Sequence, residues 1–315
     1  MGCFFEKESY NRYGVNDMEK EYAALMIDLK GSRKLDDEMR KDIQIYWDEI
    51  RRRLNDMFCG TMEFKVDFSG GDQIQGLFYT PEAAYLYYRL FSMCTHPVQT
   101  HGGIGIGSWS VKMVGKPTGS QDGTAYHRAK AASDLADADI GYPILLNSEN
   151  IDRDRIINSL IGTAALRALE HTAHQNQIML LTELLYPISG GYLGPDRETF
   201  LKNSYELICL KNNFDREFAG SQKNKKKVTK KRKDLPLESL IRQNSNPFVR
   251  ATVRKAAKTK NPTNYVTEGK GRGIPKTLEE VLGIKYQSIN TTLKAADIFN
   301  IRNLSIAALE EMRRI

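Results

Sequence analysis

Apolar residues in the first half of the chain recur with two different periods, and the pattern predicts alternating strands and helices. Residues 22–28 form a short apolar run that ends in a carboxylate, which is typical of a buried central strand. Residues 36–57 carry apolar side chains at helical spacing. Residues 62–68 alternate with period two and residues 74–79 form another apolar run, so the Gly-Gly-Asp turn between them predicts a tight hairpin.

The same half continues with a second helix, a glycine-rich strand and a third helix. Pro81 opens an amphipathic helix that reaches Cys94, residues 102–107 form the glycine-rich strand, and residues 125–138 are helical. This order of elements is the split βαβ, or ferredoxin-like, arrangement. In a sheet of that kind the first strand and the hairpin lie side by side, so we expect their ends to meet.

The second half of the chain is predicted to be mostly helical. Helical spacing covers residues 151–185 and, after a Pro-Ile-Ser-Gly-Gly break, residues 196–211. Residues 222–233 are almost wholly polar and hold eight Lys and Arg side chains. They are expected to be a solvated linker, and neutralisation of nucleic-acid phosphates is the alternative. A last helical segment begins at Thr277.

This last segment has the pattern of a helix-turn-helix. Residues 277–280 match a capping box, Gly283 stops the first helix, and residues 286–296 form the next helix, which buries Ile289 and Leu293. Residues 304–312 predict a closing helix. A plain helical hairpin or a protein-contact module is the alternative. The side chains that the second helix would present to DNA are Lys285, Tyr286, Gln287, Ser288, Asn290, Thr291 and Lys294.

The sequence therefore predicts an α+β protein, with a ferredoxin-like N-terminal domain followed by a mostly helical C-terminal part that contains the helix-turn-helix. The expected divisions are an N-terminal extension (1–20), the ferredoxin-like domain (21–150), a helical region (151–215), a basic linker or insert (216–275) and the helix-turn-helix (276–315).

Charge is distributed unevenly along the chain. The net charge is +7, but residues 211–315 hold 24 Lys and Arg against 10 Asp and Glu, a net of +14, which leaves −7 for residues 1–210. A basic second half is expected where only that half meets a polyanion, DNA or else RNA. Chance combined with a solubilising linker is the alternative. Four scattered cysteines and the lack of an apolar run of about 20 residues predict a cytoplasmic protein with no membrane partner.

Asp28 and Asp72 are the clearest chemical signal in the sequence. Asp28 closes the apolar first strand, and Asp72 follows two glycines in the hairpin. Two carboxylates that converge beside glycine-lined backbone suit Mg²⁺, with Mn²⁺ as the alternative, together with a nucleoside triphosphate or a related nucleotide. Ordinary hairpin chemistry is the alternative reading of the same residues.

The motifs around this pair resemble two known families. Residues 69–76, Ser-Gly-Gly-Asp-Gln-Ile-Gln-Gly, are similar to the hairpin signature of GGDEF-type nucleotide cyclases. The closer resemblance is to the SatD family, through Asp28 with Ser32-Arg33, the Gly-Asp hairpin, the glycine strand at 103–107 and the segment 122–130. It covers residues 22–140 and implies a nucleotide-cyclase-like or palm-like domain that is followed by a helix-turn-helix.

The cyclase resemblance implies that Asp28 and Asp72 are the metal-binding and catalytic positions. The chain departs from the cyclase pattern at Gln73 and Lys30, where acidic residues are usual. In the alternative reading, Arg33, Arg128 and Lys130 are surface charges and Asp122 belongs to a turn. The glycines of the strand at 103–107 then allow a helix to pack closely against that strand. The nucleotide contacts that we expect are Ser32, Arg33, Ser69, Gly70, Gly71, Asp122, Arg128 and Lys130.

Together these features predict a nucleotide-responsive DNA-binding regulator of the SatD type. One alternative is a metal-dependent nucleotide cyclase or nucleotidyltransferase-like enzyme that makes a nucleotide signal. Another is a scaffold without catalysis. A homodimer is a further expectation, because helix-turn-helix proteins often bind paired half-sites as dimers.

Overall fold

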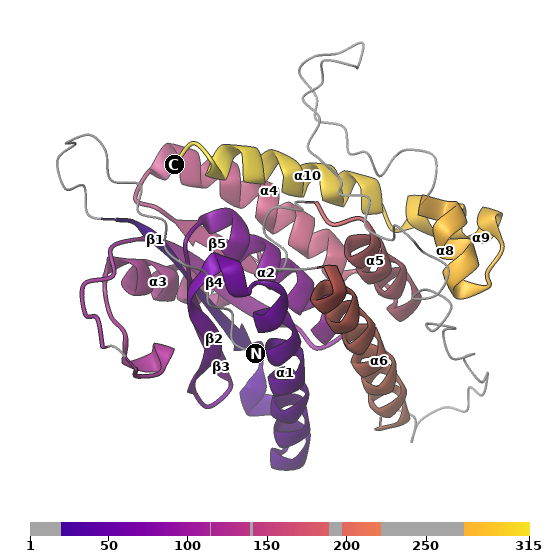
Figure 1. Cartoon of the computed structure of the whole chain (residues 1–315), viewed down its shortest axis with the longest axis horizontal. Helices are drawn as coiled ribbons and strands as arrows, with labels where there is room; N and C mark the ends of the chain where they lie inside the picture. The colour runs from indigo at the N-terminus through magenta and orange to yellow at the C-terminus, as the bar shows by residue number, and fades with distance from the viewer. Residues whose placement is uncertain (1–19, 114, 139–140, 189–196, 222–273) are drawn as a thin grey trace, which may run out of the picture.

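The computed structural model describes residues 20–113, 115–138, 141–188, 197–221 and 274–315 (Figure 1). Its centre is a five-stranded mixed sheet in the order β2-β3-β1-β4-β5. The strands are β1 (Tyr22–Leu29), β2 (Met62–Gly70), β3 (Gln73–Phe78), β4 (Thr100–Gly107) and β5 (Ile144–Asn147). Strand β1 runs antiparallel to β3 and β4, whereas β5 is parallel to β4. The α+β class is confirmed, and the first strand lies beside the hairpin as expected.

Alternate residues of β1 face two different layers. Ala23, Leu25 and Ile27 belong to the core formed with helices α1 (Asp37–Met57) and α2 (Pro81–Thr95). Ala24 and Met26 belong to a second cluster with helix α3 (Thr124–Ala138). Because side chains alternate along a strand, Asp28 lies on the α3 face of the sheet.

The first two helices begin at the caps that their sequences provide. The Asp36 side chain accepts a hydrogen bond from the Met39 amide at 2.8 Å, and Thr80 caps α2 just before Pro81. The helices at 36–57, 81–94 and 125–138, and the hairpin between the strands at 62–68 and 74–79, are confirmed.

The glycines of β4 serve helix packing. A Cβ atom at Gly103 would overlap the backbone of α3 at Ala129 and Ser133, and one at Gly105 would overlap it at Ala125 and Ala129. Helix α3 therefore lies directly on the strand, at a distance that a larger residue would prevent. The structure thus shows the close helix packing that the sequence analysis gave as the alternative reading of these glycines.

Helices form most of the second half, and the hydrophobic core continues into them from the sheet. They are α4 (Ile151–Leu169), α5 (Ala173–Leu185), α6 (Arg197–Ser221), α8 (Ile274–Leu282), α9 (Tyr286–Ala295) and α10 (Ile298–Met312). Helix α10 packs along α4, and α6 packs along α1 (Figure 1). The helical stretch expected at 151–185 is divided, because Thr172 and Gln175 form a capping box that starts α5.

Several boundaries differ from the sequence-based expectation. The prediction of a capping box at 277–280 is wrong. Helix α8 already begins at Ile274, and the Thr277 hydroxyl bonds to the Tyr186 hydroxyl at 2.8 Å. Helix α6 extends to Ser221 and α10 begins at Ile298, so both are longer than expected. The four-residue strand β5 was not expected, because a run this short has no recognisable period.

Two of the expected divisions fall largely outside the described residues. These are the N-terminal extension at 1–20 and the basic linker at 216–275, of which the structure describes only residue 20, residues 216–221 and residues 274–275. No helix in the described ranges combines the length and the apolar character that a membrane span requires. Cys94 and Cys209 are free thiols.

Candidate functional site

Asp28 stands near the end of β1, opposite His101 of β4. Its side chain is half-buried, and its Oδ1 accepts a hydrogen bond from the Leu29 amide at 2.9 Å. Burial raises the pKa of Asp28, and the negative charge of Asp72 raises it further. The Leu29 hydrogen bond and the charges of His101 and Lys130 act in the opposite direction.

Asp72 occupies the two-residue turn between β2 and β3. Gly71 before it has φ of 57°, a left-handed conformation that glycine adopts without steric cost. The Asp72 Oδ2 atom is buried and has no hydrogen-bond partner among the described residues. Because Ile27 of β1 pairs with Ile74 of β3, the turn lies next to the end of β1. The structure therefore brings the two carboxylates together, as the strand order predicted.

His101 is a neighbour of Asp28 that the sequence analysis missed. It is buried, with 8% of its surface exposed, and it pairs across the strands with Asp28. Residues paired in this way project from the same face of the sheet. The only signal that could have identified His101 is the register between β1 and β4, which no local pattern in the sequence reveals.

Positive charge surrounds the pair. Lys130 of α3 is exposed, forms an ion pair with Asp134, and still lowers the pKa of Asp28. Ser32 and Arg33 lie in the 3-10 turn that directly follows β1, with Ser32 half-buried and Arg33 exposed. These three expected nucleotide contacts therefore lie on segments that adjoin the carboxylates.

The hairpin residues form the other side of the site. The Ser69 hydroxyl donates a hydrogen bond to the Gln73 side-chain oxygen at 3.1 Å, and the Gln44 amide of α1 donates one to the Gly71 carbonyl at 3.2 Å. A Cβ atom at Gly70 or Gly71 would meet no heavy atom within 4 Å. The backbone at this turn is therefore open on its outer side and can be approached by a ligand.

Asp122 and Arg128 lie elsewhere. Arg128 donates a hydrogen bond to the Ile106 carbonyl and pairs with Glu149, while Asp122 bridges to Val111 just before α3. Ile106 is five residues along β4 from His101, or about 17 Å at the usual rise of an extended strand. The structure thus separates these two expected nucleotide contacts from the carboxylate pair and places them at the opposite end of β4.

The carboxylate oxygens of Asp28 and Asp72 suit a hard cation that takes its remaining ligands from water or from a bound molecule. Among the described residues, no group of three or more His, Cys, Asp and Glu side chains could hold a metal by itself. Magnesium typically uses one or two carboxylates and completes its shell with waters and phosphate oxygens. The buried, unpartnered Asp72 Oδ2 is suited to such an ion, because a cation would offset both its desolvation and its repulsion with Asp28.

The expected DNA contacts lie on α9 (Tyr286–Ala295) and the residue before it. Ile289 and Leu293 of α9 are buried, as predicted, and Gly283 ends α8 with φ of 61°. Helices α5, α8 and α9 pack against one another. Lys285, Tyr286, Gln287, Ser288, Thr291 and Lys294 are exposed, and Asn290 is half-buried.

Comparison with known proteins gives one finding. The family model described as SatD family matches residues 22–187, which is more than half of the 315-residue chain. The match covers the whole sheet, the carboxylate pair and helices α1–α5. No curated protein and no solved structure matches the chain.

Proposed function

The chain belongs to the SatD family, and we propose that it is a nucleotide-responsive DNA-binding regulator. In this proposal a nucleotide binds with Mg²⁺ at Asp28 and Asp72, and α9 contacts DNA. The observation that carries the nucleotide site is the meeting of two carboxylates, one of them with a buried and unpartnered oxygen, beside an open glycine turn.

The strand order supports a ferredoxin-like, palm-type domain. The order β2-β3-β1-β4, with each neighbour antiparallel, is the arrangement that the split βαβ unit produces. Strand β5 adds to the edge beside β4. In such a sheet the end of β1 and the turn between β2 and β3 lie side by side. Asp28 and Asp72 lie there, and we call this edge of the sheet the carboxylate ledge.

The charges around the ledge favour a phosphorylated ligand. Lys30, Arg33 and Lys34 are exposed on the segment that follows β1, and Lys130 is exposed on α3. Two carboxylates alone would repel a triphosphate, so Asp28 and Asp72 would hold Mg²⁺ when the nucleotide binds, and the surrounding lysines and arginine would bind the outer phosphates. Bound Mg²⁺ would supply charge neutralisation for the phosphates.

The packing of α5, α8 and α9 supports the helix-turn-helix. The turn at Gly283 is tight, and the buried side chains of α9 fix the orientation of its polar face. Helix α2 packs against both β1 and α5, while α5 packs against α8 and α9. These contacts connect the ledge to the proposed DNA-binding face through a continuous series of packed elements.

Thermal unfolding against a panel of nucleoside triphosphates tests the nucleotide site. With Mg²⁺ present, we expect the melting temperature to rise for at least one nucleotide in the wild type and not in Asp72→Asn. The matched control is Asp122→Asn, because this carboxylate lies near the other end of β4 and its loss should leave the shift unchanged. A shift that persists in Asp72→Asn contradicts the site, as does no shift with any nucleotide.

DNA binding is tested separately on α9. Binding to a random-sequence duplex should weaken in Gln287→Ala/Asn290→Ala, and the affinity of the wild type should fall steeply with salt. Glu310→Gln/Glu311→Gln on α10 is a control that changes the surface elsewhere. Duplex binding that is equal in the α9 variant and the wild type would exclude α9 as the contact.

The second candidate is an enzyme that transfers a nucleotidyl group, and the same carboxylate pair favours it. A metal held there could lower the pKa of an attacking hydroxyl and stabilise the charge that develops on the phosphoryl group. Release of pyrophosphate from a triphosphate by the wild type, absent in Asp28→Asn and Asp72→Asn, would establish this function. Nucleotide-dependent stabilisation without pyrophosphate release supports the regulator.

A further inference from the structure

A groove of about 680 Å³ lies between α1 and α6. Its apolar lining includes Met39 and Tyr46 of α1 and Phe214 and Phe218 of α6. The rings of Tyr46 and Phe214 stack with their centroids 4.1 Å apart. Beside them, Ile45 is 56% exposed, which is high for an isoleucine on a packed helix. The groove therefore offers apolar surface that the described residues leave uncovered.

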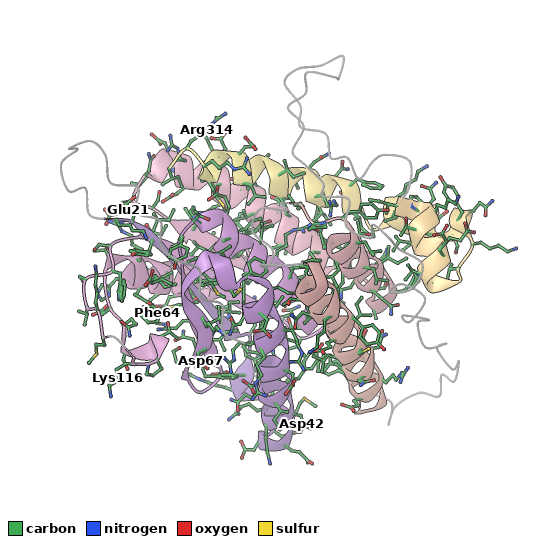
Figure 2. The ribbon with its side chains drawn as sticks, viewed as in Figure 1. Glu21, Asp42, Phe64, Asp67, Lys116 and Arg314 are labelled. Carbon is green, nitrogen blue, oxygen red and sulfur yellow. The ribbon has the colours of Figure 1, made fainter. Side chains whose placement is uncertain are left out.

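Carboxylates surround this apolar surface. Five acidic residues line the groove, and none of its lining residues in the described part of the chain is Lys or Arg; the five are Asp36, Glu38, Asp42, Glu49 and Glu217. Asp36 caps α1, and Glu49 pairs with Arg52 and Arg53. Glu38, Asp42 and Glu217 have no ion pair with any residue that the structure describes. Figure 2 shows Asp42 near the end of α1, directed outward.

The groove lies close to the point where the described part of α6 ends. Phe218 lines the groove, and the helix ends three residues later at Ser221. In the sequence, residues 222–233 follow directly, with eight Lys and Arg and no Asp or Glu. A segment attached so close to an acidic groove is present there at an effective concentration in the millimolar range.

We propose that residues 222–233 bind in the α1–α6 groove of the same chain. Their ammonium and guanidinium groups would pair with Glu38, Asp42 and Glu217, and the methylene stems of the lysines would cover the apolar lining. The inference is independent of the nucleotide site. It assigns the lysine run an acidic partner within the protein, in addition to its roles as a linker or a nucleic-acid contact.

Photo-cross-linking in the full chain tests this. With p-benzoylphenylalanine in place of Ile45, illumination should produce cross-links within one chain, and mass spectrometry should locate them in residues 222–233. Raising NaCl from 0.05 M to 1 M should reduce their yield at least about fivefold, because the screening length shortens to about 3 Å. The same reporter in place of Ile156 on α4, which is 54% exposed, should produce no such cross-link.

Neutralising the groove should have the same effect as salt. We expect the yield to fall at least about fivefold in Glu38→Gln/Asp42→Asn/Glu217→Gln, and to stay at the wild-type level in Asp56→Asn/Asp134→Asn/Asp152→Asn, which removes as many charges outside the groove. If the groove variant Glu38→Gln/Asp42→Asn/Glu217→Gln fails to fold, the salt dependence of the cross-link yield in the chain with an unchanged groove tests the proposal instead. Cross-links that join two chains, fall elsewhere or ignore both salt and neutralisation overturn the proposal.

Discussion

At the scale of single residues, Asp28 is where stability and the proposed function should oppose each other. Its pKa in the folded protein is raised, so the carboxylate destabilises the fold above that pKa, and the penalty disappears as the pH falls below the unfolded value of 3.8. Asp28→Asn should therefore raise the melting temperature at pH 7 in EDTA by about 2 °C, and the gain should vanish near pH 3.5. Differential scanning calorimetry across this range measures it.

A control and a metal titration complete this experiment. Asp134→Asn removes an exposed carboxylate on α3 and should change the melting temperature little. Added Mg²⁺ should stabilise the wild type and not Asp28→Asn, since only the wild type offers both carboxylates. A lower melting temperature for Asp28→Asn at pH 7 would mean that Asp28 is a structural acceptor and not a ligand.

His96 gives the chain a specific sensitivity to acid. Burial, together with the positive charge of Lys211, lowers the pKa of His96 to about 4. Because the unfolded chain binds a proton near pH 6.5, stability from this residue is complete above that pH and is lost as the pH falls through 6.5 towards 4.

His96→Gln should remove this part of the acid sensitivity. Between pH 7 and pH 4.5 the wild type should lose on the order of 2 kcal/mol more unfolding free energy than the variant, as measured by urea titration at each pH. His127→Gln, at an exposed histidine, is the control and should follow the wild type. Parallel losses in wild type and His96→Gln would show that other groups carry the acid response.

At the scale of elements, the contact between β4 and α3 depends on glycine. A methyl group at Gly105 would overlap backbone atoms on both Ala125 and Ala129, and backbone in a packed helix cannot move aside. Gly105→Ala should therefore destabilise the protein by about 3 kcal/mol, at the upper end of the usual cost of overpacking, as measured by urea unfolding. Gly60→Ala is the matched control, because a Cβ there meets no atom within 4 Å. Equal stability of the two variants would contradict direct packing.

The same elements show what a sequence can and cannot predict. Periodicity identified the hairpin, α1 and α2, and a continuous apolar run identified β1, which is buried on both faces of the sheet. It missed β5, because a four-residue strand is recognisable only by its pairing with β4. It also misplaced the start of α8, where the Thr277 hydroxyl that would cap the helix instead bonds to the Tyr186 hydroxyl. Local signals specify elements more reliably than their boundaries.

The candidate site, like the elements, could be predicted only in part from the sequence. Strand order alone brings Asp28 and Asp72 together, so their meeting could be expected from the sequence. His101 depends on the register of β4 and was missed, while Asp122 and Arg128 follow the expected motif in sequence but lie near the far end of the same strand. The roles of all these residues stay predictions.

At the scale of the whole molecule, one hydrophobic core joins the sheet to the C-terminal helices. It runs from Ala23 on β1 to Met312 on α10. At the join, Glu183 of α5 pairs with Arg89 of α2 at 2.7 Å and with Arg302 of α10 at 2.8 Å, and all three side chains are at most 6% exposed. Arg302 also donates to the Tyr186 carbonyl at 2.7 Å. Burial lowers the pKa of Arg302, and Glu183 opposes this effect.

This buried triad should be costly to break and inexpensive to replace. Glu183→Ala leaves two buried guanidinium groups without their counter-charge, so it should cost about 3–5 kcal/mol of unfolding free energy in urea titration. The apolar triple change Arg89→Met/Glu183→Leu/Arg302→Met buries no charge and should recover most of that loss. Arg167→Ala, which breaks the exposed pair with Asp297, should cost no more than about 1 kcal/mol. If Glu183→Ala proves as mild as Arg167→Ala, the join between sheet and helices rests on apolar packing alone, and the triad only fixes how α2, α5 and α10 are aligned.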